Sequence, residues 1–323
     1  MELVAEIGPA NGDIEYALDV VNAAKECGFT QIKGQMYDRD LLVTRTAPTY
    51  AQEGIAVPET QYEDFGTTLT YDEWATVYQE AERIGIPMFF SVFDIPAVRA
   101  CEMLGVERYK IASGDVTYRQ LIERVAATGR LIVMSTGAST YAEVVRATGW
   151  AMMRNSAGLT LLACSLSYPT LKADAHLARM KRLRSIWPDV GYSDHTFGVG
   201  AMVRAKHLGA VLLEKHFTIT PGAGGDHDFA VTPAQMQNLV EWDTGDPTYD
   251  GSPTLEASQA EQKAKVGARR SIYAANGLFQ GNMLEPKDVL FLRPGGGLEP
   301  WELPDTPLLV DVEAGQMLHG DMF

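Results

Sequence analysis

Two lysines and several serines lie at or near the C-terminal ends of short apolar segments, where charged side chains are uncommon. Lys33 and Lys110 are the lysines, and Ser113, Ser135 and Ser193 occupy the same kind of position. A charge inside a buried strand is costly unless it is paired or faces a solvated site. Because ammonium and hydroxyl groups bind carboxylate and phosphate oxygens, these residues predict a site for a small polyanion.

His195 and His216 end two successive apolar segments and form a second candidate group. Two imidazoles on one divalent metal ion would leave its remaining positions to water and substrate, which suits catalysis. The alternative is that each is a hydrogen-bonded structural residue, the more common role of a single histidine. His176, His207 and His319 have no comparable neighbours and are interpreted as structural.

Eight short apolar segments carry these polar residues and predict the strands of a parallel sheet. None alternates cleanly between apolar and polar residues, which is typical of strands buried on both faces. The predicted strands are Val4–Gly8, Gln31–Gln35, Pro87–Val92, Tyr109–Ser113, Leu131–Thr136, Leu159–Cys164, Val190–His195 and Ala210–Thr218. Amphipathic stretches between them predict helices at Ile14–Cys27, Tyr71–Arg83, Pro96–Leu104, Tyr118–Ala127, Tyr141–Met153 and Gly198–Leu208.

Eight βα units over about 245 residues predict an α/β fold, a (β/α)8 TIM barrel. The alternative is an open doubly wound sheet, but no Gly-x-Gly-x-x-Gly motif follows the first strand. On a barrel, catalytic groups lie at the C-terminal ends of strands, where the polar residues of this chain are found. The residues alone therefore predict a barrel enzyme that handles a phosphorylated or carboxylated small molecule with a metal ion. They leave the reaction open.

Two loops carry further information. More than thirty residues separate Gln35 from the helix at Tyr71, which favours a lid or substrate-contacting loop, or else a decorative insertion. The Gly-rich segment Pro221–His227 follows the eighth strand, where such barrels often bind phosphate through backbone amides. Because it ends in Asp226 and His227, we expect it to contact a hydroxylated substrate instead.

The strand and helix pattern changes after the barrel. We expect a synthase domain at 1–245, a linker rich in Gly, Pro, Asp and Ser at 246–267, and a small β-rich domain at 268–323. The linker ends in a charged helical stretch, Leu255–Val266.

The net charge of −15 argues against nucleic acid or an anionic membrane as a partner. Three widely spaced cysteines do not form a disulfide framework. No apolar run approaches the roughly 20 residues of a membrane span, and no signal peptide follows Met1. We expect a cytoplasmic protein with a local basic pocket.

The strand ends, taken as strings, resemble the sialic acid synthase family, whose members join phosphoenolpyruvate to an amino-sugar aldehyde. The matching barrel strings are AEIGPANGD (5–13), IKGQ (32–35), FFSVFD (89–94), YKIASGD (109–115), MSTGA (134–138), LLACSLSYPT (161–170), GYSDHT (191–196), EKHFT (214–218) and GGDHDFA (225–230). The C-terminal strings ARRSIYA (268–274), FLRPGGGLEP (291–300) and VDVEAGQML (310–318) resemble the antifreeze-like, SAF-type domain of that family. The most specific signal is GYSDHT followed by EKHFT.

The resemblance implies roles for most of the candidate residues. Phosphoenolpyruvate, the co-substrate, would be held by Lys33, Lys110, Ser113, Ser135 and Ser193. A divalent metal ion, manganese or magnesium, would be bound by His195 and His216. Glu6 would act as general base or hold a water molecule. Asp115 and Asp226 would complete the catalytic group and contact the acceptor sugar, together with Gln35 and Tyr168. Arg293 would enter the site of a partner subunit, which implies a domain-swapped homodimer.

Four positions depart from the family pattern. They are Gly34 in place of an aromatic residue, Asp115 in place of Glu, Ala163 in place of His, and Leu166 in place of a small polar residue. They leave the acceptor open, among N-acetylmannosamine, a bacillosamine-derived deoxy sugar, or a sugar outside the nonulosonic acid pathways. They also motivate two rivals: a metal-dependent aldolase that uses pyruvate, and a sugar-binding protein with a degenerate active site.

Overall fold

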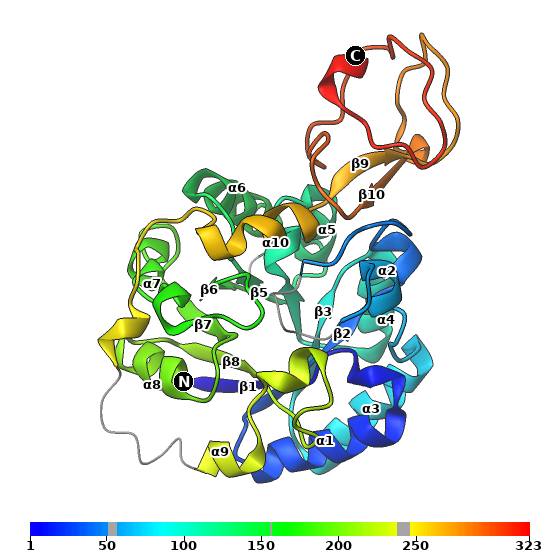
Figure 1. The fold of residues 1–323 in the computed structure, drawn as a ribbon. Helices are drawn as coiled ribbons and strands as arrows, with labels where there is room; N and C mark the ends of the chain where they lie inside the picture. The colour runs from blue at the N-terminus through cyan, green and yellow to red at the C-terminus, as the bar shows by residue number, and fades with distance from the viewer. Residues whose placement is uncertain (51–56, 156, 238–245) are drawn as a thin grey trace.

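The computed structural model describes residues 1–50, 57–155, 157–237 and 246–323. Its centre is a closed barrel of eight parallel strands in sequence order, so the predicted TIM barrel is confirmed (Figure 1). The strands are β1 (Glu2–Glu6), β2 (Gln31–Met36), β3 (Met88–Val92), β4 (Arg108–Ile111), β5 (Leu131–Ser135), β6 (Leu159–Cys164), β7 (Val190–Asp194) and β8 (Leu212–His216). The barrel closes between β1 and β8, where Glu6 is in register with His216, and Glu6 is also in register with Lys33 of β2.

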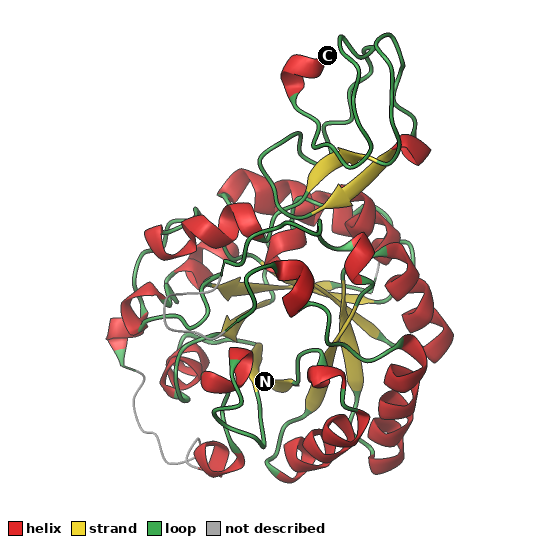
Figure 2. Cartoon of the chain, turned by 45° about the vertical axis from the view of Figure 1, so that its right-hand side comes forward, coloured by secondary structure: helices red, strands yellow, loops and turns green. Residues whose placement is uncertain are grey.

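Helices surround the barrel, as Figure 2 shows. The six predicted helices are present, each within two residues of its expected ends: α1 (Ile14–Glu26), α3 (Tyr71–Ile84), α4 (Ile95–Leu104), α5 (Arg119–Ala126), α6 (Tyr141–Met152) and α8 (Gly200–His207). Three shorter helices were not predicted: α2 (Gln61–Asp64), α7 (Arg179–Leu183) and α9 (Pro233–Gln237). A fourth, α10 (Gln262–Gly267), overlaps the helical stretch expected at Leu255–Val266. Capping boxes at Thr70 and Thr140 fix the starts of α3 and α6, because each threonine and the glutamate three residues later satisfy each other's backbone amides.

Along each strand, alternate side chains point into the barrel. The first of them form the apolar interior, and the next ones form the site. Five inward-facing residues, one each from β1, β3, β5, β6 and β8, form an apolar cluster inside the barrel: Val4, Phe89, Val133, Leu162 and Leu212. Two residues further along a strand, the side chain points to the same interior. On β1 and β8 those next residues are Glu6 and Glu214. The short strands therefore fill the barrel with their first half and present polar groups at its C-terminal mouth.

The segment 246–267, expected to be a linker, packs against the barrel. Asp250 forms an ion pair with Arg204 of α8 (Nη2–Oδ2 2.5 Å). The amide of Leu177 donates to the carbonyl of Tyr249, and the amide of Tyr141 donates to that of Leu255. The segment ends in α10, which begins seven residues later than the helical stretch expected from Leu255 and ends one residue beyond Val266.

The C-terminal residues form a small unit that projects from the barrel (Figure 1). Its antiparallel strands β9 (Ser271–Ala274) and β10 (Val289–Leu292) agree with the predicted β-rich character. The unit has its own apolar cluster, which includes Ile272, Leu284 and Leu308. Its SAF-type assignment stays a resemblance.

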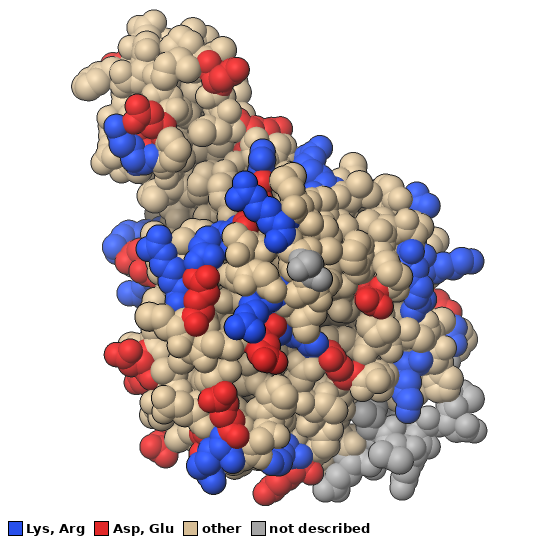
Figure 3. All heavy atoms as spheres, turned by 180° about the vertical axis from the view of Figure 1, so that it is seen from behind, with Lys and Arg blue, Asp and Glu red and all other residues tan. Residues whose placement is uncertain are grey.

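The surface carries mixed charge. On the face in Figure 3, acidic and basic side chains are interspersed over the barrel. Among the described residues, no helix is long and apolar enough to cross a bilayer.

Candidate active site

The floor of the barrel mouth is a buried group of opposite charges. The ammonium group of Lys110 lies 2.7 Å from Oε2 and 2.9 Å from Oε1 of Glu214, whose Oε1 also accepts a hydrogen bond from Ser193 (2.8 Å). Lys33 pairs with Glu6 and donates to Ser91 Oγ (2.9 Å), and its Nζ lies 3.8 Å from Glu214 Oε1. All of these side chains line one cavity of about 160 Å³, so the structure brings the predicted lysines together.

Burial and neighbouring charges shift the pKa values of the lysines and of Glu214 on this floor. Burial disfavours the charged form of Lys33, but Glu214 and Glu6 outweigh burial and raise its pKa. Burial lowers the pKa of Lys110 despite its ion pair with Glu214. Burial acts to raise the pKa of Glu214, yet Lys110 and Lys33 hold it well below its usual range. Glu214 is therefore ionised at neutral pH and lies where an incoming anion would meet the lysines.

Two of the predicted serines add hydrogen-bonding groups above this floor. Ser113 Oγ accepts from the backbone amide of Gly137 (2.9 Å), which leaves its own proton to donate. Ser135 Oγ is buried and has no hydrogen-bond partner among the described residues. Both line the cavity. A buried hydroxyl without a partner is costly, so an anion that accepts from it would be favoured.

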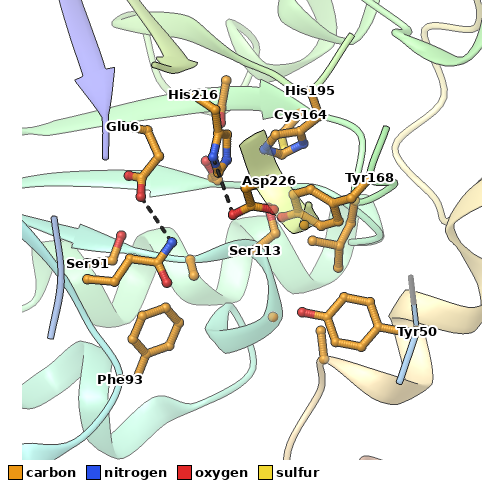
Figure 4. Close-up of a pocket in the computed structure, with 18 of the residues that line it drawn as sticks. Glu6, Tyr50, Ser91, Phe93, Ser113, Cys164, Tyr168, His195, His216 and Asp226 are labelled. Atoms are coloured by element: carbon orange, nitrogen blue, oxygen red, sulfur yellow. Dashed lines mark hydrogen bonds and ion pairs between the residues drawn. The ribbon is translucent and has the colours of Figure 1, made fainter. Parts of the chain in front are cut away.

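His195 and His216 lie side by side on the rim of the same cavity, with ring centroids 5.5 Å apart (Figure 4). The Nδ1 atom of His195 lies 2.9 Å from the carbonyl oxygen of Ser165, and that of His216 lies 3.4 Å from Asp226 Oδ2. Because a carbonyl only accepts, Nδ1 of His195 carries the proton and Nε2 has a free lone pair. Burial first, then the neighbouring His216, lowers the pKa of His195 to about 3. Burial first, then Lys33, lowers the pKa of His216 to about 3.

These histidines fit a metal site with few protein ligands. Metal-binding histidines typically donate their second nitrogen to a carbonyl or carboxylate. His195 does so to the carbonyl of Ser165, and the second nitrogen of His216 lies next to the carboxylate of Asp226. They are neutral, as metal binding requires. No group of three or more histidine, cysteine, aspartate or glutamate side chains able to bind a metal ion occurs in the part of the chain that the structure describes. Any ion held here would therefore depend on water and substrate for its remaining ligands.

The wall around the histidines is aromatic and acidic. The ring of Tyr168 packs on His195 at 4.3 Å between centroids, and Phe229 packs on His216 at 5.1 Å. Partial desolvation, followed by the charges of Glu6 and Asp64, raises the pKa of Asp226 to about 7.

Gln35 and the long β2–α3 loop complete this wall. Gln35 donates to Glu6 Oε1 (3.0 Å), which also accepts from the amide of Gly8 (2.8 Å). The long loop contributes Tyr50, Gln61 and other residues to the cavity, as the substrate-contacting interpretation predicts. Residues 51–56 of this loop lie outside the described part of the chain.

Asp115 is not placed as predicted. It is fully buried, it does not line the cavity, and Oδ1 accepts from Arg270 Nε at 2.6 Å. Arg270 also donates to the carbonyls of Leu41, Phe93 and Phe291. The shorter carboxylate therefore joins the barrel to the C-terminal unit and does not face an acceptor sugar.

Arg293 lines the cavity of its own chain. Its backbone pairs with the β2–α3 loop through Leu42 and Thr44, and its guanidinium lies 3.8 Å from Asp115 Oδ2 and 5.4 Å from the rings of Phe65 and Phe93. The resemblance assigns this arginine to a partner's site, whereas in this structure the same chain supplies it.

Only one of the four departures from the family pattern touches the cavity among the described residues. Leu166 lines it. Gly34 points to the helices, where an added Cβ would lie 2.9 Å from the indole of Trp74, so that indole occupies the space of a larger side chain. Ala163 belongs to the core between the barrel and its helices. Two departures therefore concern packing and a third, Asp115, concerns a buried ion pair, so these three give little support to a degenerate active site.

Sequence reasoning missed several residues of the site. Glu214 is a charged residue inside a predicted buried strand, but it was not among the predicted site residues, whereas its neighbour His216 was. Ser91 lies on the inward face of β3. Tyr50 and Gln61, the first residue of α2, lie in the long β2–α3 connection, whose path no sequence pattern predicts.

Comparisons with known proteins agree with this geometry. The model of the NeuB family matches residues 20–243. N,N'-diacetyllegionaminic acid synthase of Legionella pneumophila is 32% identical, over 98% of this chain and 92% of that protein. Pseudaminic acid synthase of Helicobacter pylori is 30% identical, over 93% of this chain and 90% of that protein.

A solved structure shares the fold. The spore coat polysaccharide biosynthesis protein spsE from Bacillus subtilis superposes with a TM-score of 0.82, over 99% of this chain and 94% of that chain, at 21% identity. The superposition shows the shared fold, and the family model and the sequence matches confirm the family that the strand-end motifs predicted: the chain belongs to the NeuB family.

Proposed function

We propose that this protein condenses phosphoenolpyruvate with an amino-sugar aldehyde to give a nonulosonic acid and inorganic phosphate. The observation that carries the proposal is the pair of buried lysines, Lys33 and Lys110, beneath two neutral histidines in one cavity. The lysines suit a small anion, and the histidines suit the activation of a carbonyl group. The relatives named as legionaminic and pseudaminic acid synthases support the same product class.

Phosphoenolpyruvate would bind on the floor of the cavity. Lys33, Lys110 and the hydroxyls of Ser113, Ser135 and Ser193 would hold its phosphate and carboxylate oxygens. Glu6 and Glu214 compensate the lysines before the substrate arrives, so binding requires that the lysines exchange a carboxylate partner for the substrate. Holding the alkene close to the acceptor carbonyl would supply much of the rate enhancement.

The condensation forms one carbon–carbon bond and breaks the C2–O bond of phosphoenolpyruvate. The C3 carbon of phosphoenolpyruvate forms a bond to the aldehyde carbon, which leaves a cationic centre at C2. Water adds at C2 and gives up one proton, and the new alkoxide takes up one proton. The C2–O bond to phosphate then breaks, phosphate leaves with the electron pair and takes up the proton of the C2 hydroxyl, and C2 becomes a ketone carbon. Glu6, fixed by Gln35 and the amide of Gly8, is the carboxylate that would take the proton of water.

The acceptor would lie against the aromatic and acidic wall. Tyr168, Gln35 and Asp226 would orient its hydroxyl and amide groups. Arg293 of the C-terminal unit, which lines the same cavity, would contact the substrates from there. A manganese or magnesium ion, held by Nε2 of His195 and His216, would polarise the aldehyde oxygen as a Lewis acid. The protein is also proposed to form a homodimer, which the family resemblance supports.

A phosphate-release screen over amino-sugar aldoses tests this function. We expect release only when phosphoenolpyruvate, a suitable aldose and a divalent metal ion are all present. Mass spectrometry of the product should show addition of the three-carbon acid to the sugar. Phosphate release without an acceptor, or equal turnover with pyruvate in place of phosphoenolpyruvate, would contradict the proposal and favour the aldolase.

A further inference from the structure

The segment 246–267 places one fully buried carboxylate, Glu261, beneath the walls of the cavity. Its Oε1 atom accepts hydrogen bonds from the amides of Ala138 (2.7 Å) and Leu166 (2.9 Å). Its Oε2 atom accepts from the amide of Ser258 (2.9 Å) and from Arg179 Nη2 (3.0 Å). One side chain thus joins the β5–α6 loop, the loop after β6, helix α7 and the supposed linker.

Arg179 extends the same connection. It is buried, and it donates to the carbonyl of Cys164 at the end of β6 (3.2 Å) and to those of Thr254 (3.1 Å) and Glu256 (2.8 Å) in the segment 246–267. Ala264, on α10, packs with Ala138 and Leu166 in one apolar cluster. The segment is therefore attached to both loops by charge, hydrogen bonds and apolar contact.

Both loops are connected to groups that line the cavity. Leu166, in the loop after β6, and Cys164, the last residue of β6, line it directly. Gly137, next to Ala138, donates its amide to Ser113 Oγ and so sets the direction of that hydroxyl. A shift of the Ala138 and Leu166 amides would move Ser113 and Leu166 on the cavity wall, where misplacement of about 1 Å can cost roughly a hundredfold in rate.

We infer that Glu261 is a positioning residue for the anion subsite, acting through the loops after β5 and β6. The inference rests on the proposed function, because the anion is taken to be phosphoenolpyruvate. It makes the segment 246–267 part of the active site.

The test compares two anchors of the same segment. Glu261→Ala removes the acceptor of the loop amides, whereas Asp250→Asn weakens the ion pair to Arg204, whose partner lies on α8 and does not line the cavity. Equilibrium binding of phosphoenolpyruvate is measured by calorimetry without acceptor, so that no turnover occurs. We expect Glu261→Ala to weaken binding roughly tenfold to a hundredfold and Asp250→Asn to change it less than about twofold.

Hydrogen exchange provides a second readout, which a loss of global stability alone would not reproduce. In Glu261→Ala the amides of Ala138 and Leu166 should lose protection, while those of the barrel strands keep it. Equal effects of the two variants on phosphoenolpyruvate binding, or unchanged protection of both amides, would overturn the inference. Because some loss of stability is expected, Glu261→Gln serves as the milder variant: its carbonyl oxygen can still accept from both loop amides, so binding should weaken less than in Glu261→Ala.

The two proposals fail in different ways. Wild-type protein that binds phosphoenolpyruvate but releases no phosphate with any aldose would refute the proposed function and leave the comparison of variants decisive for Glu261. Wild-type protein that does not bind phosphoenolpyruvate at all would refute both.

Discussion

Lys110 and Glu214 form a buried ion pair across the barrel, with Nζ 2.7 Å from Oε2, although their strands β4 and β8 lie on opposite sides of the closed sheet. The pair spans the barrel axis at the level where the apolar interior ends. Glu214 also lies near Lys33, which pairs with Glu6, so the two carboxylates together compensate the two buried cations.

Replacing Lys110 tests the anion subsite. Lys110→Met should lower kcat/KM for phosphoenolpyruvate by roughly 30-fold to several thousand-fold, because losing a buried charge partner costs about 2–5 kcal/mol. The double variant Lys110→Met/Glu214→Gln controls for stability, because it removes both charges. It should recover stability in denaturant but not kcat/KM, and recovery of kcat/KM would contradict the assignment.

Removal of the metal ion tests the histidine pair. Chelation should abolish phosphate release, and added manganese or magnesium should restore it. His195→Ala and His216→Ala should each weaken manganese binding by about 10–100-fold or more, measured by equilibrium dialysis. His207→Ala, an exposed change on α8, should leave manganese binding as in wild type. Full activity of either site variant in chelated buffer would refute the site.

We expect Asp115 to stabilise the fold and to take no direct part in catalysis. Asp115→Ala leaves Arg270 buried without its carboxylate, which should cost about 3–5 kcal/mol of unfolding free energy. Asp226→Ala is the contrasting change, because its side chain is 45% exposed and lines the cavity. It should lose activity and little stability. A stable Asp115→Ala protein with abolished turnover would restore the catalytic role that the resemblance implied.

Variants of Arg293 test whether each active site is completed by its own chain or by a partner subunit. Arg293→Ala should lower activity, because the guanidinium lies on the wall of the cavity. In the arrangement of this structure, mixing Arg293→Ala chains with His216→Ala chains leaves every site defective, so activity should not return after subunit exchange. Regained activity would place Arg293 in the partner's site, as the family resemblance predicts.

The Glu261 carboxylate should make the protein sensitive to acid. Burial acts to raise its pKa, but Arg179 and the hydrogen bonds it accepts outweigh burial and lower it. Because the folded pKa lies below the unfolded value of about 4.3, this contribution to stability is present at higher pH and is lost as the pH falls through the folded pKa. The difference in unfolding free energy between wild type and Glu261→Gln should therefore shrink below about pH 4.3. A constant difference would argue against an ionised Glu261.

The sequence by itself determined the barrel and most residues of its mouth. Buried parallel strands read as continuous apolar runs, so Lys33, Lys110, His195 and His216 were conspicuous at their ends, and the fold brings all strand ends to one face. Local patterns carry this information because strand direction and side-chain alternation follow from the backbone alone.

Only the tertiary structure decided which of these groups meet. Glu214 reaches Lys110 across the barrel axis, Asp115 is withdrawn by Arg270 from 155 residues away, and Glu261 enters from a segment that looked like a linker. Trp74 likewise fills the space beside Gly34. Each depends on contacts between segments distant in the chain, where composition and periodicity carry no information about distance, and where burial makes the choice of partner energetically decisive.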